Sequence, residues 1–166
     1  MLKNLRNLKL YPAIILGMLA FWIVYDVYAT STGRSMRTST TSDGCGSPTT
    51  GCHGNGRNLA TSLSFTGNVN VEANSVNNYT ISVQNANREK AGINVAVKTT
   101  ITGDEDGGTL TEGSGMKKIL GEITHDSPKD ISGGKADFSF TWTAPSLPGV
   151  YYLRAVGNAV DNNNAA

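Results

Sequence analysis

The sequence predicts an all-β protein, a single antiparallel sandwich of about seven strands preceded by one N-terminal hydrophobic helix. From Leu59 onward, apolar residues alternate with polar ones at the period of two that half-buried strands show. Turn residues separate these runs, and nothing after residue 30 sustains the period of a helix. Charged residues make up only 16% of the 166-residue chain, and Gly, Ser, Thr and Asn are abundant. This composition suits short strands joined by turns.

Residues 1–29 are expected to be a signal anchor or a signal peptide. Basic residues precede the uninterrupted apolar run Ala13 to Val24 (AIILGMLAFWIV), and a small-residue pattern ends at Ala29. The run has the length of a signal-peptide core, whereas the stretch Leu8 to Ala29 could span a membrane. Both alternatives export the rest of the chain. We therefore expect a single-pass cell-membrane protein with its domain on the periplasmic or extracytoplasmic side.

Three further segments follow. Residues 30–43 (TSTGRSMRTSTTSD) are rich in Ser and Thr without apolar periodicity, which predicts a flexible tether. Residues 44–58 contain five glycines and both cysteines of the chain, and they are expected to form a Cys/His loop. Residues 59–166 are expected to form the β-sandwich.

The strands are predicted from alternation and turn signals. Leu63 and Phe65, followed by Val69 and Val71, flank a Gly67-Asn68 turn, which predicts a hairpin. The remaining strands are expected around Tyr79 to Val83, Ile93 to Val97, Ile119 to Ile123, Phe138 to Trp142, and Val150 to Val156.

Two clusters in this part have competing interpretations. The aromatic stripe Phe138, Phe140 and Trp142 is interpreted as core rather than as a ligand platform, because period-two aromatics on a strand usually face the interior. The acidic run Asp104-Glu105-Asp106 lacks the spaced ligands of a calcium loop. It is interpreted as a solvated turn.

Charge and motifs disfavour several classes of function. The net charge is +1, and no basic stripe with interleaved aromatics is present, so nucleic acid is not expected as a partner. No serine-histidine-acid arrangement, paired carboxylates or phosphate-cradling glycine motif is readable. We expect the protein not to be an enzyme.

The candidate chemical centre is the sequence GCGSPTTGCHG, which contains Cys45, Cys52 and His53. A disulfide is one interpretation, because exported thiols tend to oxidise. A zinc or copper site is a second, with Cys45, Cys52 and His53 as three ligands and His125 as a fourth. Covalent haem c is the third. It needs two thiols that add across the vinyl groups and a histidine directly after the second thiol, usually as C-x-x-C-H.

The spacing here departs from that pattern, because the six residues Gly46 to Gly51 separate the two thiols. A longer intervening loop can bulge away, since the covalent geometry constrains only the thiols and the histidine. A disulfide does not require the adjacency of Cys52 and His53. For a haem iron, His125 is the expected sixth ligand and Met116, expected in a Gly-rich loop, is the alternative. A bis-histidine iron is closed and suits electron transfer.

The chain also resembles a known family. The segments Cys52-His53-Gly54, Ile123-Thr124-His125, Phe140 to Pro145 (FTWTAP) and Tyr151 to Val160 (YYLRAVGNAV) are similar to features of choice-of-anchor V domains. These are bacterial exported domains related to reeler-like sandwiches. The resemblance covers Gly44 to Asp161. It implies an Ig-like or reeler-like sandwich with a single c-type haem, a role in extracytoplasmic electron transfer, and a histidine at position 125.

Two functional hypotheses remain. The first is a membrane-tethered monohaem c-type cytochrome-like electron-transfer protein or subunit, whose partners are redox proteins or a larger membrane complex. The alternative is a structural or adhesive module of an envelope complex, with a Cys45–Cys52 disulfide and no cofactor.

Overall fold

The computed structural model describes residues 32–35, 38 and 59–161. The predicted hydrophobic helix in residues 1–29 and the Cys/His loop 44–58 lie outside the described residues. Nine strands form: β1 (Ser62–Thr66), β2 (Val76–Gln84), β3 (Lys90–Lys98), β4 (Thr109–Thr111), β5 (Met116–Ile119), β6 (Glu122–His125), β7 (Lys129–Asp130), β8 (Lys135–Thr143) and β9 (Tyr152–Val160). All strand pairs are antiparallel. The predicted all-β antiparallel class is therefore confirmed, with nine strands instead of about seven.

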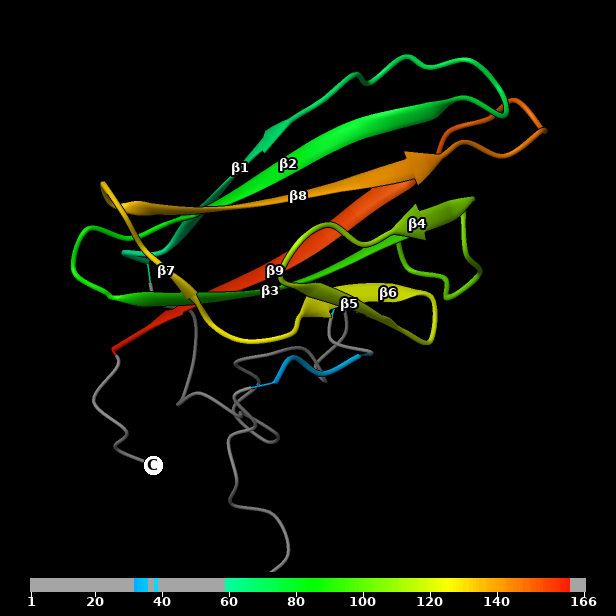
Figure 1. The fold of residues 1–166 in the computed structure, drawn as a ribbon. Helices are drawn as coiled ribbons and strands as arrows, with labels where there is room; N and C mark the ends of the chain where they lie inside the picture. The colour runs from blue at the N-terminus through cyan, green and yellow to red at the C-terminus, as the bar shows by residue number, and fades with distance from the viewer. Residues whose placement is uncertain (1–31, 36–37, 39–58, 162–166) are drawn as a thin grey trace, which may run out of the picture.

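The strands form two stacked sheets (Figure 1). Sheet A has the order β1-β2-β8-β4. Sheet B is centred on β3, which pairs with β9 along one edge and with β6 and then β7 along the other, while β5 lies beyond β6. The chain crosses between the sheets from β2 to β3 and again from β8 to β9. Long strands adjacent in sequence therefore lie in different layers.

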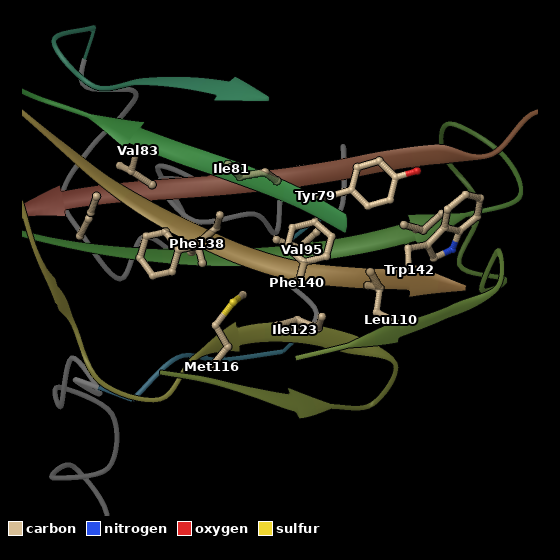
Figure 2. Packing of buried hydrophobic residues seen from close by; sticks show 14 of the residues in the cluster. Tyr79, Ile81, Val83, Val95, Leu110, Met116, Ile123, Phe138, Phe140 and Trp142 are labelled. Carbon is tan, nitrogen blue, oxygen red and sulfur yellow. The ribbon is translucent and has the colours of Figure 1, made fainter. Parts of the chain in front are cut away.

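The core lies between the two sheets and follows the period of two (Figure 2). In β8, Phe138, Phe140 and Trp142 are buried, whereas Ser139 between them is exposed. The Tyr79 ring packs on Phe140 and Trp142, with centroid separations of 6.0 and 6.3 Å. The interpretation of the aromatic stripe as core is thus confirmed.

The outer face of sheet A is polar and is held by cross-strand pairs between β2 and β8. The Thr80 and Ser139 hydroxyls lie 2.9 Å apart, and the Ser82 hydroxyl donates to Asp137 Oδ1 over 2.5 Å. The Ser82 hydrogen bond, followed by that from Lys135, lowers the pKa of Asp137 below its ordinary value.

The predicted hairpin at Gly67-Asn68 is wrong. Residues 67–75 contain no strand, and β1 instead pairs with β2, so that Phe65 lies opposite Ile81. The backbone after β1 covers a core aromatic: the Tyr79 hydroxyl donates to the Asn68 carbonyl oxygen over 3.0 Å. A Cβ at Gly67 would come within 2.1 Å of Tyr79 Cδ1. The glycine is therefore needed for close approach to Tyr79 and not for a tight turn.

The prediction of one strand from Ile119 to Ile123 is also wrong. Ile119 ends β5 and Ile123 lies in β6, and the two strands form a hairpin. Its turn is made by Leu120 and Gly121, with φ of 50° and 82°. Leu120 is exposed at this turn, whereas Ile123 is fully buried.

The last strand is shifted from its predicted position. Val150 lies before β9 and is exposed, and the residues of β9 that pack against the core are Leu153, Ala155 and Ala159. Because side chains alternate along a strand, this one-residue shift turns Val156 to the opposite face. Gly157 faces inward, where a Cβ would lie 2.5 Å from Leu63 Cδ2 and 2.9 Å from Val83 Cγ2.

Truncation of Phe138 tests the core assignment. Phe138→Ala removes a ring that is 2% exposed, so we expect it to lower the free energy of unfolding by about 3–5 kcal/mol. The matched change Leu147→Ala, at a side chain that is 75% exposed, is expected to change it by less than about 0.5 kcal/mol. Urea unfolding measures both variants, and equal effects would contradict the assignment.

The Ser82–Asp137 pair predicts a pH dependence. A carboxyl whose folded pKa is lowered contributes stability above its unfolded pKa, and this contribution is lost as the pH falls through the folded pKa. Ser82→Ala is expected to raise the pKa of Asp137 toward its ordinary value and to reduce this acid-dependent loss. NMR titration of the Asp137 carboxyl carbon measures the shift. Thr80→Ala is the control, because Thr80 pairs with Ser139, and an equal shift there would contradict the assignment.

Candidate functional site

The predicted site residues fall in two parts of the chain. Cys45, Cys52 and His53 lie outside the described residues, so the disulfide, metal and haem interpretations of their loop stay predictions. His125 ends β6, and Met116 begins β5. Within residues 32–35, 38 and 59–161, no group of three or more His, Cys, Asp or Glu side chains is placed to hold a metal ion.

His125 fills a gap in the ladder of sheet B. Along one edge, β3 pairs with β6 at Asn94 and Val95 and with β7 at Lys90 and Ala91, which leaves the segment between without a strand partner. Side chains take the place of that partner. The Ile93 amide lies 3.1 Å from His125 Nδ1, and the Thr124 hydroxyl donates to the Ile93 carbonyl oxygen over 2.9 Å.

Gly92 allows the imidazole to lie against β3. A Cβ at this position would lie 2.5 Å from His125 Cε1 and 2.9 Å from each ring nitrogen. Any other residue would therefore displace the ring. The result is a half-buried imidazole held against β3.

The tautomer of His125 decides its chemistry. Nδ1 is 3.1 Å from both the amide nitrogen and the carbonyl oxygen of Ile93. If Nδ1 accepts from the amide, the neutral ring carries its proton on Nε2. If Nδ1–H donates to the carbonyl, the Nε2 lone pair is available to a metal. Among the described residues, Nε2 has no hydrogen-bond partner.

Met116 lies in a strand and not in the predicted Gly-rich loop. It is the register partner of His125 in the β5–β6 hairpin. Its side chain is 8% exposed and belongs to the core cluster, beside Phe138 and Ile123 (Figure 2). The thioether therefore contributes to packing, whereas His125 contacts β3.

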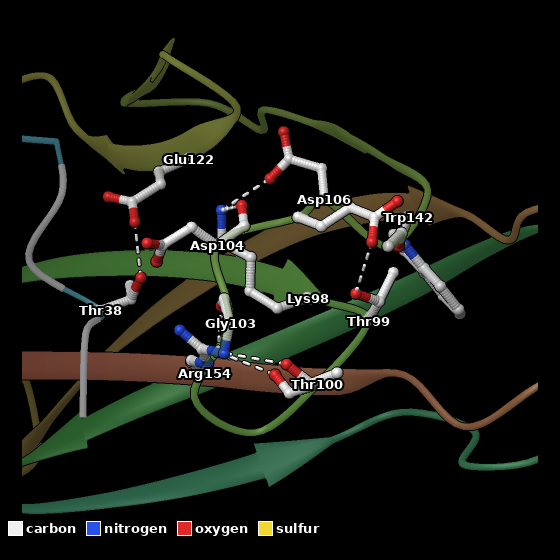
Figure 3. A network of polar contacts seen from close by, with 12 residues as sticks. Thr38, Lys98, Thr99, Thr100, Gly103, Asp104, Asp106, Glu122, Trp142 and Arg154 are labelled. Carbon is white, nitrogen blue, oxygen red and sulfur yellow. Dashed lines mark hydrogen bonds and ion pairs between the residues drawn. The ribbon is translucent and has the colours of Figure 1, made fainter.

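The described residues before the sandwich, 32–35 and 38, form a strap on the outer face of sheet B. The Gly33 amide donates to the His125 carbonyl oxygen over 3.1 Å, and Asn94 Nδ2 donates to the Arg34 carbonyl oxygen over 2.5 Å. The Thr38 hydroxyl donates to Glu122 Oε1 over 2.5 Å, and Thr38 is only 3% exposed (Figure 3). This part of the predicted tether is thus docked on the sandwich.

Two buried cations fold the 99–106 loop over the same face of sheet B (Figure 3). Lys98 Nζ donates to the Asp104 carbonyl oxygen over 2.9 Å and to Asp106 Oδ1 over 2.7 Å. Arg154 Nη2 donates to the carbonyl oxygens of Thr100 and Gly103. The acidic run is exposed, as expected for a solvated turn, and the Asp106 carboxylate also pairs with a Lys98 side chain that is only 9% exposed.

Sequence reasoning missed the residues that position His125. Gly92 interrupts a run of strand-forming residues, and a glycine inside a strand often marks a close approach by another group. That signal was readable at Gly92. Nothing in the Ser/Thr-rich pattern distinguishes Gly33 or Thr38 from their neighbours, since their contacts are with residues far along the chain.

No protein-family model matches the chain, and no curated protein matches it. Among solved structures, the chain is similar to the crystal structure of the human F-spondin reeler domain (fragment 1), with 16% sequence identity and a TM-score of 0.45. The match covers 64% of this chain and 79% of that chain.

The membrane prediction depends on residues 1–29. No helix long and apolar enough to cross a bilayer occurs in the part of the chain that the structure describes.

Substitution of Gly33 tests the strap. A Cβ there would lie 1.7 Å from Thr124 Oγ1, so Gly33→Ala is expected to release the strap and to speed amide exchange in residues 32–35 and 38 about tenfold or more. Gly149→Ala is the matched control, because a Cβ there lies 3.7 Å from the Tyr151 ring, at ordinary contact distance. Hydrogen exchange followed by mass spectrometry measures both. Unchanged exchange in Gly33→Ala would mean that the strap does not depend on this contact.

Proposed function

We propose that the protein is a membrane-tethered, extracytoplasmic monohaem c-type cytochrome-like electron-transfer protein or subunit. Cys45 and Cys52 would attach the haem c, and His53 and His125 would hold its iron. The observation that carries the proposal is the His125 imidazole: Nδ1 is fixed by the Ile93 backbone, and Nε2 has no hydrogen-bond partner among the described residues. Metal-binding histidines are commonly oriented in this way.

The strap supports the same proposal through chain length. The Gly33 amide bonds to the carbonyl of His125 itself, and Thr38 bonds to Glu122 on the same strand. Cys45 follows Thr38 by seven residues, and a chain of that length reaches at most about 25 Å. In this proposal, the Cys/His loop would lie within that reach of the outer face of sheet B.

The donor set fits a haem c. Two thiols, an adjacent histidine and one distant histidine match the ligands that attachment and six-coordination require. When bound, the haem supplies the one-electron carrier. The chain's own contribution at His125 is orientation: an Nδ1–H donated to the Ile93 carbonyl would keep the Nε2 lone pair free, and the Ile93 amide would then give up its Nδ1 acceptor.

The proposed partners follow from the rest of the chain. Residues 1–29 would hold the protein at the membrane, with the sandwich on the periplasmic side. Redox proteins or a larger membrane complex would then exchange electrons with it, without a catalytic reaction of its own. The resemblance of Gly44 to Asp161 to choice-of-anchor V domains agrees with this proposal.

A structural or adhesive role in an envelope complex is the second candidate, with Cys45 and Cys52 joined as a disulfide. The observation that favours it is the free edge of β9, a nine-residue strand in sheet B that no other described strand covers. Such an edge suits assembly with another strand.

Intact mass and visible absorption distinguish the two candidates. For full-length protein from a host with active haem maturation, we expect a mass gain of one haem and absorption that survives denaturation. Cys52→Ala should abolish both. A bare mass lacking two hydrogens would instead establish the disulfide and contradict the haem proposal.

The role of His125 as an iron ligand is tested separately. If haem is attached, His125→Ala is expected to convert low-spin iron to high-spin iron, which visible and electron paramagnetic resonance spectra report. Met116→Leu is the control, because it conserves the volume of a core side chain and should leave the spin state unchanged. Loss of the low-spin signal in Met116→Leu alone would assign the iron to methionine.

A further inference from the structure

The two sides of the sandwich end in different kinds of strand. On one side the edge strands are β4 and β5, which are three and four residues long, and β5 carries Lys117 and Lys118. Short strands and lysines are devices by which proteins prevent their sheet edges from pairing with other chains. On the other side the edge strand of sheet B is β9, which has nine residues.

β9 has none of these protective devices. It contains no proline and no acidic residue, and it pairs with β3 in continuous register from Lys90↔Val160 to Lys98↔Tyr152. Arg154 is the single charged residue between positions 139 and 160. Its Nη2 is engaged by the carbonyl oxygens of Thr100 and Gly103 in its own molecule.

The backbone of β9 offers a regular row of hydrogen-bonding groups at this edge. In an antiparallel ladder, the N–H and C=O groups of alternate residues point to opposite sides of the strand. The Val160 carbonyl accepts from the Glu89 amide on the β3 side. The alternation therefore directs the backbone groups of Leu153, Ala155, Gly157 and Ala159 away from β3, where no described strand pairs with them.

We propose that this edge is a self-association surface, at which a second copy of the chain adds its own β9 antiparallel to the first. An identical strand supplies the same length and the same alternation, and a two-fold axis makes the contact self-complementary. Because Arg154 is the one charged residue on each strand and is held by its own 99–106 loop, few like charges meet at the contact. Side chains on the inner face are small near the axis, at Ala155, Gly157 and Ala159, so the two sandwiches can approach closely.

The geometry also fixes the register. The pairing that overlaps all nine residues places Leu153 opposite Ala159 and Ala155 opposite Gly157. Val156 then lies on the two-fold axis, opposite Val156 of the second copy. Its side chain is on the outer face of sheet B and half-buried in one copy.

Charge changes at Val156 test both the surface and the register. Full-length protein in density-matched detergent should sediment as a dimer. Val156→Lys and Val156→Glu each place like charges on the axis, so each should raise the dimer dissociation constant at least about tenfold. An equimolar mixture of the two variants should restore the dimer. Ile101→Lys, at an exposed position in the 99–106 loop, is the control and should not change association.

A second measurement needs no substitution. Amide exchange at Leu153, Ala155, Gly157 and Ala159 should slow as the concentration of the unmodified protein rises, while exchange in β4 stays constant. A monomer throughout the micromolar range would overturn the proposal, and so would a dimer that neither Val156 variant weakens. The protein could instead stay monomeric by itself and bind an extended peptide at β9. That result would show that the edge pairs with a different partner, and it would also overturn the proposal of self-association.

Discussion

The structure depends on β3 being buried on both faces. One face of this strand packs Ile93, Val95 and Val97 into the sandwich, and the other carries Asn94, Ala96 and Lys98, which are also buried. Polar groups taken out of water must find partners, because an unpaired one costs about 1–3 kcal/mol. The strap, the 99–106 loop and His125 all supply partners to β3 or to the strands beside it.

This constraint explains why so many contacts on the outer face of sheet B join polar side chains to backbone carbonyls. Lys98, Asn94 and Arg154 each donate to at least one carbonyl oxygen. Carbonyls are available wherever irregular chain crosses a sheet, so a loop and a strap can cover the face without a second hydrophobic layer. The pairing is incomplete among the described residues, because Asn94 Oδ1 and Arg154 Nε are buried without a partner.

The features of the fold that were predictable are those that local alternation determines. β2, β3 and β8 are long and carry period-two apolar residues, and the packing of sheet A on sheet B buries Ile81, Val95 and Phe138 as the pattern indicates. The errors arose where backbone geometry was decided by a distant group. Gly67 looked like a turn residue, but it is needed beneath Tyr79, which is twelve positions away in the sequence.

The candidate site was predictable in its residue types and not in its environment. The sequence singles out His125, because it is one of only two histidines. Its hydrogen bonds to Ile93 depend on the gap that β6 and β7 leave along the edge of β3. No local sequence pattern predicts this gap. Likewise, the docking of Thr38 depends on Glu122, 84 positions later in the chain.

Gly92 and His125 are linked by the space that they share. The imidazole occupies the volume that a side chain at position 92 would need, so position 92 is free to change only once the histidine is lost. A chain that loses the histidine no longer needs the glycine, and a chain that gains a side chain at position 92 must first lose the imidazole. In an evolving lineage, loss of the histidine would therefore precede loss of the glycine.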